Sequence, residues 1–166
     1  MTCFSKTCFS FPELFSDKIS FINKSFYIVL KYIYKLFKLL VQSWRKNWNN
    51  ANMPFYYVQL SSLNRPSWPW FRDSQRRLME EIPHTGMAVC TDKGDSLDVH
   101  PIRKQEVGER LARWALNQTY GNQNVVPSGP LYKNISFQKN VAYVSFDHAE
   151  GLKASDGHEL RTFEIA

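Results

Sequence analysis

Glycine is missing from the first half of this 166-residue chain, because all seven glycines lie at or after Gly86. Glycines form the tight turns that bring backbone N–H groups against phosphates or oxyanions. Residues 1–85 therefore cannot hold a P-loop, a dinucleotide-binding fingerprint or a glycine-containing nucleophile elbow. This absence excludes several large classes of catalytic motif from half of the chain.

Cysteine is also scarce, and its three copies fit no recognised framework. Cys3, Cys8 and Cys90 match neither a metal-binding spacing nor a disulfide pattern. Cys90 lies in an apolar, strand-like stretch, so we interpret it as a small core residue. The redox environment of the protein cannot be inferred from these cysteines.

A long uncharged apolar run is absent as well. Lysines interrupt the segment 19–44, which never approaches the roughly 18 apolar residues that a spanning helix needs. The chain also lacks a compact signal-peptide core with a small-residue cleavage site. We therefore expect no spanning membrane segment, although a basic amphipathic helix on a membrane surface remains an alternative for residues 19–48.

Acidic residues are few at the N-terminal end. Residues 1–50 hold eight Lys/Arg and two Asp/Glu, whereas residues 51–166 hold thirteen of each sign. The net charge of +6 therefore belongs to the N-terminal segment. Because the remainder is neutral, we expect no nucleic-acid partner. A hydrophobic content of 43% excludes a generally disordered chain.

The hydrophobic pattern predicts alternating helices and strands from about residue 34 onward. Strands are predicted at 55–60 and 86–91, and helices at 71–82 and 102–120, the last closed by Gly121. This order predicts an α/β fold with a parallel sheet, in which functional groups collect at the carboxyl ends of the strands. A further helix before residue 50 is expected to bury one apolar face, made by Leu36, Phe37, Leu40, Val41, Trp44 and Trp48.

In about the last forty residues the sequence pattern changes from alternating helices and strands to strands alone. A hinge-like stretch at 125–130 precedes strand-like segments at 131–138, 141–146 and 160–165, which predict the start of a small β domain. We therefore divide the chain into a basic, Phe-rich segment at 1–33 that stays unassigned, an α/β part at 34–124 and a β part at 125–166.

The most informative motif is Asp98-Val-His100-Pro101, which falls in the loop after the second predicted strand. An acid two residues before a histidine can orient that histidine as a general base. Alternatively, His100 only packs in the loop or caps the next helix. A metal cluster with Asp92 and Asp95 is the weaker interpretation, because calcium needs more oxygen ligands and zinc more His or Cys. We expect no metal site.

A second group of candidates lies in the loop after the first predicted strand. Trp68 and Trp70 are aromatic faces that could stack on a sugar ring, and Arg65 could contact the same substrate. Both tryptophans could equally fill the core. The sequence leaves these two interpretations open.

Five passages of the chain resemble a known family, and together they span about four-fifths of it. They are residues 40–48, 54–60, 84–89, 98–108 and 143–152, the last followed by Asp156-Gly157. With these motifs the chain resembles the C-terminal part of the sialate O-acetylesterases, carbohydrate esterases of the SGNH-hydrolase type. The resemblance implies a three-layer α/β/α sandwich, a serine nucleophile with a histidine base, no cofactor, and O-acetylated sialic acid or another acetylated glycan as substrate. It also implies that His100 is the catalytic histidine and that Asp98 is its acid partner.

The chain departs from this family in one important respect. The family's nucleophile lies in a Gly-Gln-Ser-Asn segment, and neither this segment nor the further glycine and asparagine blocks of the oxyanion hole occur here. Some SGNH enzymes place the acid three residues before the histidine, where this chain has Leu97, so Asp95 or a backbone carbonyl are alternatives to Asp98.

We therefore expect a truncated esterase that is inactive by itself, and the alternative is a non-catalytic glycan-binding or scaffold remnant. The family is typically secreted, periplasmic or lysosomal, but the localisation and the oligomeric state of this chain are not predicted.

Overall fold

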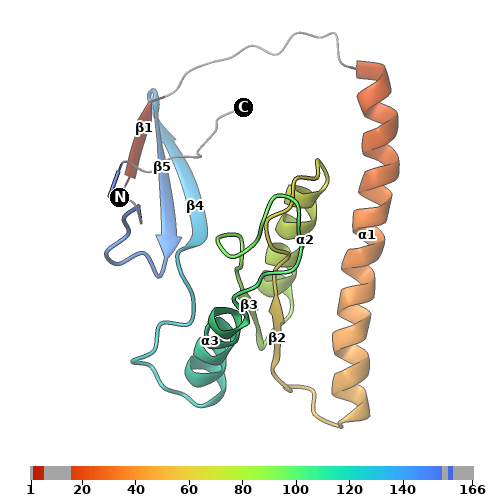
Figure 1. The fold of residues 1–166 in the computed structure, drawn as a ribbon, viewed down its shortest axis with the longest axis vertical. Coiled ribbons are helices and arrows are strands. Elements are labelled where there is room, and N and C mark those ends of the chain that lie inside the picture. The colour runs from red at the N-terminus through yellow and green to blue at the C-terminus, as the bar shows by residue number, and fades with distance from the viewer. Residues whose placement is uncertain (1, 6–15, 155–156, 159–166) are drawn as a thin grey trace. The chain divides into compact units, whose positions relative to one another are not determined.

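The computed structural model describes residues 2–5, 16–154 and 157–158, and for residues 2–5, 16–28, 30 and 31 it describes the backbone alone. The chain forms two compact units (Figure 1). One comprises Ser16–Pro127, and the other combines Met1–Phe15 with Ser128–Ala166. The boundaries drawn from the sequence, at 33/34 and 124/125, stay predictions.

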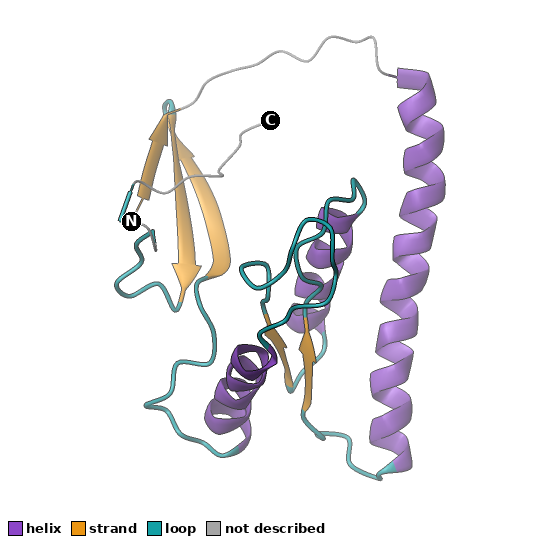
Figure 2. Cartoon of the chain, in the orientation of Figure 1, coloured by secondary structure: helices purple, strands orange, loops and turns teal. Residues whose placement is uncertain are grey.

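The larger unit contains alternating helices and strands (Figure 2). In chain order it comprises α1 (Ser16–Asn47), β2 (Phe55–Val58), α2 (Trp68–Glu81), β3 (Thr85–Ala88), α3 (Lys104–Trp114) and the π-helical turn η2 (Ala115–Thr119). Strands β2 and β3 pair in parallel, with Tyr56 opposite Gly86 and Tyr57 opposite Met87. The predicted α/β class with a parallel sheet is therefore confirmed.

Both faces of this sheet are covered, as the four consecutive buried residues of β3 require. On one face, the Tyr57 hydroxyl donates a hydrogen bond to the backbone oxygen of Gln75 in α2 at 2.5 Å. On the opposite face, Gly86 lies against the ring of Trp114 in α3, whose indole N–H donates to the backbone oxygen of Met87. The unit is therefore a three-layer arrangement of helix, sheet and helix.

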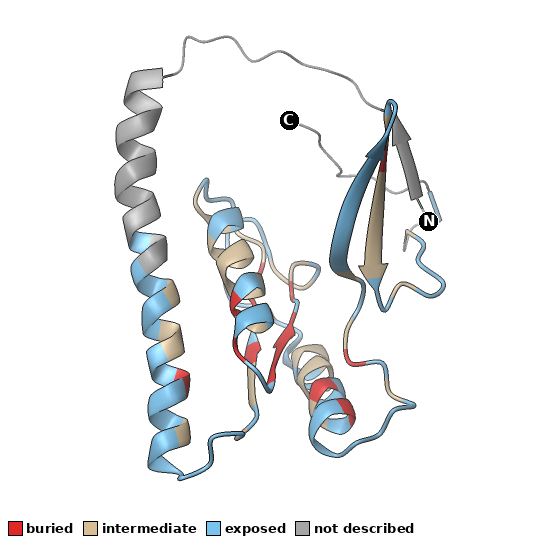
Figure 3. Ribbon diagram, turned by 180° about the vertical axis from the view of Figure 1, so that it is seen from behind, coloured by how far each residue is buried: buried red, intermediate tan, exposed pale blue. Residues whose placement is uncertain are grey.

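Helix α1 packs against α2 through a small apolar core. Val41, Leu78 and Ile82 are buried together, with Phe37 packed beside them. The predicted buried face of this helix was wrong in part (Figure 3), because Leu36, Leu40, Trp44 and Trp48 are between 43% and 65% exposed. Leu36 and Leu40 lie about a quarter turn around α1 from Phe37 and Val41, and α2 covers only the stripe of Phe37 and Val41.

The start of one helix differs from the sequence prediction, whereas the end of another agrees with it. Helix α2 begins at Trp68, three residues before the predicted start, because Pro69 is tolerated in the first turn of a helix. The predicted end near Tyr120 is confirmed, with Gly121 at φ 69°. A π-helical turn follows Trp114, and within it Asn117 is buried whereas the apolar Leu116 is 40% exposed.

The smaller unit is a three-stranded antiparallel sheet. It contains β1 (Thr2–Ser5), β4 (Leu131–Gln138) and β5 (Val141–Asp147) in the order β1-β5-β4. The predicted strands at 131–138 and 141–146 are confirmed, and Lys139 at φ 53° forms the turn between them. Strand β1 was not predicted. The strand expected at 160–165 and Asp156 of the turn at 156–157 lie outside the described residues.

Candidate active site

The candidate site is built on two loops that leave the same edge of the parallel sheet. The first follows β2, and the second follows β3 and carries Asp98 and His100. Because β2 and β3 run in parallel, their carboxyl ends lie side by side, which is where α/β proteins gather ligand-binding groups. The predicted position of the His100 loop at this edge is confirmed.

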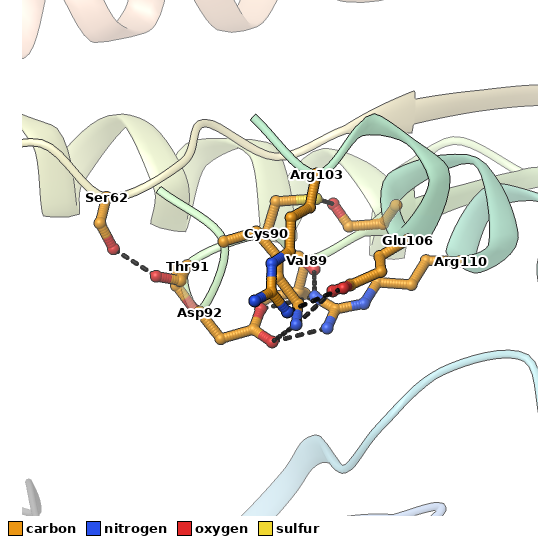
Figure 4. Close-up of polar contacts among 10 residues, drawn as sticks. Ser62, Val89, Cys90, Thr91, Asp92, Arg103, Glu106 and Arg110 are labelled. Atoms are coloured by element: carbon orange, nitrogen blue, oxygen red, sulfur yellow. Dashed lines mark hydrogen bonds and ion pairs between the residues drawn. The ribbon is translucent and has the colours of Figure 1, made fainter. Parts of the chain in front are cut away.

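Hydrogen bonds join the two loops to each other. The Ser61 hydroxyl donates to the backbone oxygen of Val99 at 2.6 Å, and the Ser62 hydroxyl donates to the backbone oxygen of Thr91 (Figure 4). The backbone of Asn64 donates to that of Ser96 at 2.9 Å. A Cβ atom at Gly94 would lie 2.4 Å from the backbone nitrogen of Ser62, so only glycine permits this approach. The position of His100 therefore depends on the loop after β2.

Arg110 of α3 binds the start of the loop that carries His100. Both terminal nitrogens of Arg110 contact the Asp92 carboxylate at 2.6 Å, and one of them also donates to the backbone oxygen of Val89 (Figure 4). The hydrogen bond from Arg110 lowers the pKa of Asp92 to about 2. Arg110 was not singled out from the sequence, because nothing in its spacing distinguishes it from a solvated helix residue. Asp92 therefore has a structural partner in Arg110.

A second group of ion pairs lies beside the Asp92–Arg110 pair. Lys93 pairs with Glu106 of α3, and Arg103 contacts the same carboxylate at 3.2 Å. The hydrogen bond from Lys93, followed by that from Arg103, lowers the pKa of Glu106. Next to these groups, the buried thiol of Cys90 has its pKa raised by burial, and the prediction of Cys90 as a core residue is confirmed.

The tip of the loop is shaped by two aspartates that accept backbone hydrogen bonds. Asp95 accepts from the backbone N–H of Leu97 at 2.7 Å, and Asp98 accepts from that of His100 at 2.9 Å. Each is a turn in which a side chain bonds the backbone two residues further on. These turns explain the spacing of the aspartates without any metal.

Asp98 also contacts the imidazole of His100. Its Oδ1 lies 2.8 Å from Nδ1 of the ring. The hydrogen bond from the backbone of His100, and then that from its ring, lower the pKa of Asp98. The carboxylate can therefore hold the ring with Nδ1–H toward it, which leaves Nε2 free to accept a proton. Asp95 bonds only the backbone of Leu97 among the contacts described, so Asp98 rather than Asp95 is the acid beside His100.

The pair lies at an open pocket of about 450 Å³. The side chain of His100 is 80% exposed and that of Asp98 is 62% exposed. The walls of the pocket come from one segment of chain, and they are formed by Asp92, Lys93, Gly94, Asp95, Asp98, His100, Ile102 and Arg103. The described pocket is therefore open, with all of its walls on the segment 92–103.

The structure separates the two tryptophans. The indole N–H of Trp68 donates to the backbone oxygen of Ser61 at 2.7 Å, and Arg65 lies over the Trp68 ring at 6.0 Å. Trp68 thus fixes the position of Ser61 in the loop after β2, and Ser61 in turn bonds the loop that carries His100. Trp70 is 60% exposed and lies two positions further along α2, where it cannot share a face with Trp68. Both belong to the first turn of α2 rather than to the loop, which corrects the predicted placement.

No group of three or more His, Cys, Asp or Glu side chains that could hold a metal ion occurs among the described residues. The described helices include none that is long and apolar enough to cross a membrane.

The chain is similar in sequence to part of several known enzymes. No family model matches the chain. The sialate O-acetylesterase of Mus musculus is 29% identical over 79% of this chain, and that of Homo sapiens is 26% identical over 78%. The chain spans only 28% and 29% of the length of these two relatives.

A solved structure agrees with the sequence relatives. The crystal structure of a carbohydrate acetylesterase from Xanthomonas citri superposes with a TM-score of 0.63 and 33% identity, over 69% of this chain and 27% of that chain. The predicted resemblance is therefore confirmed: this chain is similar, over about four-fifths of its length, to part of the sialate O-acetylesterases.

Proposed function

We propose that this chain contributes the histidine and its acid partner to the active site of an esterase that removes O-acetyl groups from sialic acids or related sugars. The observation that carries this proposal is the 2.8 Å contact between Asp98 and Nδ1 of His100 at the carboxyl edge of the parallel sheet. The similarity to sialate O-acetylesterases supports the class of substrate.

In this mechanism His100 is the general base. Its Nε2 accepts the hydroxyl proton of a serine as the serine oxygen attacks the acetyl carbonyl, and it then returns the proton to the leaving sugar oxygen. The acetyl group is now bonded to the serine. Water attacks its carbonyl while His100 takes a proton from that water, acetate leaves, and the proton returns to the serine oxygen. Asp98 holds the ring in the required tautomer and stabilises the imidazolium that forms. No step requires a metal or a cofactor.

We further propose that these 166 residues do not hydrolyse esters alone. The sequence contains no Gly-Gln-Ser-Asn segment to supply the serine. His100 and Asp98 are also largely exposed, whereas charges that develop in a reaction are best stabilised where water is excluded. The complete site therefore needs a nucleophile and a covering wall from outside these residues.

A chimera tests this proposal. The segment of the mouse sialate O-acetylesterase that this chain matches is replaced by the matching residues of this chain, and acetate release from O-acetylated sialic acid is measured. We expect activity in the chimera and none in the isolated chain. His100→Ala should lower kcat/KM of the chimera by about a hundredfold to ten-thousandfold, the usual contribution of a general base.

Two results would contradict the proposal. A chimera that keeps full activity with His100→Ala would remove His100 from the mechanism. Robust acetate release by the isolated chain, abolished by His100→Ala, would show that these residues already contain a nucleophile. Tyr120→Ala, at a position that is 76% exposed and outside the pocket, is the matched control for the fold of the chimera.

The exposed ring of Trp70 favours a second candidate, a glycan-binding remnant without catalysis. An exposed aromatic face is able to stack on a sugar ring. Binding of O-acetylated sialic acid to the isolated chain, measured by calorimetry and lost in Trp70→Ala but not in His100→Ala, would favour this alternative. Trp68 is less suited to that role, because its indole N–H already bonds Ser61.

A further inference from the structure

Helix α1 presents a second apolar face that nothing in the described structure covers. Leu36 is 61% exposed, Val29 45%, Leu40 43% and Ile33 36%. These residues recur at spacings of three and four, so they form one stripe along the helix. A surface helix of a globular protein usually has a single apolar stripe, which faces the core.

This outer stripe is distinct from the stripe that packs on the protein. Phe37 and Val41 face α2, and Phe37 also contacts Phe55 and Tyr57. At about 100° per residue, Leu36 lies roughly a quarter turn around the helix from Phe37. The exposed rings of Tyr32 and Trp44 extend the apolar surface to either side of the outer stripe. The helix thus has one apolar face that packs on the protein and a second that is exposed in the described residues.

The charge of the segment indicates the kind of partner. Residues 18–50 contain seven Lys/Arg and no Asp or Glu. Two of these basic residues serve the protein itself: Lys38 pairs with Glu81, and Arg45 donates to the backbone oxygens of Met53 and Pro83. Lys35 and Lys46 are exposed. At about 100° per residue, both lie roughly a third of a turn around α1 from the outer stripe and from the face that packs on α2.

A second copy of this chain would fit this face poorly. Pairing two copies of α1 would bring two wholly basic segments together without any acidic residue in 18–50 to compensate them. A lipid bilayer with anionic headgroups complements both the apolar stripe and the basic charge of α1. It accepts apolar side chains below the headgroups, and its negative charge attracts lysine.

We propose that the outer face of α1, defined by Val29, Ile33, Leu36 and Leu40, docks on an anionic membrane surface. The helix lies parallel to the surface with this stripe among the headgroups and upper acyl chains, while Lys35 and Lys46 reach the phosphates. This inference is independent of the proposed esterase chemistry, because none of these residues lies at the His100 pocket.

Co-sedimentation with vesicles tests the proposal. The full chain is mixed with phosphatidylcholine vesicles with and without phosphatidylserine, and the bound fraction is measured at low and high salt. We expect binding only with phosphatidylserine, and weaker binding at high salt because ions screen the lysines. Replacing Lys35 by Gln should weaken binding about fivefold, the effect of one lysine near a charged surface.

Matched variants separate the apolar face from general charge effects. Leu36→Glu places a charge in the stripe and should abolish binding, whereas Ile135→Glu on β4 makes the same change at a position 43% exposed and should leave binding unchanged. Circular dichroism confirms that each variant remains folded.

Three outcomes would overturn the proposal. The first is the absence of binding to phosphatidylserine vesicles by the wild-type chain. The second is equal loss of binding in Leu36→Glu and Ile135→Glu. The third is a dimer in analytical ultracentrifugation that Leu36→Glu dissociates, without vesicle binding, because this face would then belong to a second copy.

Discussion

Three aspartates within seven residues have three different partners. Asp92 is paired with Arg110, Asp95 turns the chain at Leu97, and Asp98 contacts both the backbone and the ring of His100. The sequence shows only their even spacing, which does not indicate which of the three carboxylates contacts His100. Which carboxylate lies beside His100 depends on the backbone path, and the path is set by contacts with a distant loop.

The Asp92–Arg110 pair predicts a specific dependence of stability on pH. The pKa of Asp92 is lowered from 3.8 to about 2 in the folded protein, so its ionised form is stabilised by folding. Stability from this pair is therefore complete above pH 3.8 and is lost as the pH falls through about 2. Asp92→Asn should reduce the free energy of unfolding by about 0.5–1 kcal/mol near neutral pH, a modest value because the pair is partly exposed.

Chemical denaturation of wild type and Asp92→Asn across this pH range measures the difference. It should be constant near neutral pH and shrink toward zero as the pH approaches 2. Glu80→Gln is a suitable control, because Glu80 is paired with Arg76 on the exposed side of α2, away from the histidine loop. A difference that persists unchanged at low pH would contradict the assigned pair.

At the scale of elements, the contact between the two loops rests on Gly94. Gly94→Ala places a Cβ atom 2.4 Å from a backbone nitrogen, which cannot rotate away, so the loops must separate. We expect a loss of about 1–3 kcal/mol in the free energy of unfolding. Gly108→Ala is the matched control: Gly108 lies within α3 with nothing near its added Cβ, so this change should stabilise the protein by about 0.5–1 kcal/mol.

Thermal unfolding of both variants distinguishes a local clash from a general intolerance of alanine. A Gly94→Ala protein as stable as wild type would show that the two loops do not meet as described. Equal destabilisation by Gly108→Ala would show that the effect is not specific to the loop contact.

The positions of helices and strands were predictable from the sequence where the hydrophobic pattern allowed a single interpretation. The strand-like segments of β4 and β5 and the apolar runs of β2 and β3 leave little choice of structure, so their positions were predicted within a few residues. The buried face of α1 was not, because nearly its whole surface is apolar or basic and only contact with α2 selects one stripe. The burial of Asn117 depends on the π-helical turn, for which the sequence carries no signal.

The candidate site was predictable to a smaller extent. His100 and Asp98 were identified by their spacing and by the family motif, and their contact is present in the structure. The residues that hold them, Ser61, Gly94 and Arg110, were missed because each acts across a long sequence separation. Such residues resemble ordinary loop and helix residues until the fold is known.

At the scale of the whole molecule, the chain combines two sheets of different construction. The parallel pair β2–β3 belongs to Ser16–Pro127, and the antiparallel sheet belongs to the unit that joins both ends of the chain. Each unit has its own buried residues, with Ala142 at 2% exposure in β5 and Leu78 at 1% in α2. Units with separate cores are expected to unfold separately.

Gly86→Ala tests this independence. The added Cβ atom would lie 2.5 Å from the buried ring of Trp114, whose N–H is held by Met87, so the packing of α3 on β3 must loosen. Scanning calorimetry should show two transitions in the wild-type chain, and Gly86→Ala should lower one of them by several degrees, as expected for a loss of about 1–3 kcal/mol. Ala142→Asp should lower only the other transition, because it buries a charge in β5. A single transition that both substitutions shift alike would mean that the two sheets unfold as one cooperative structure.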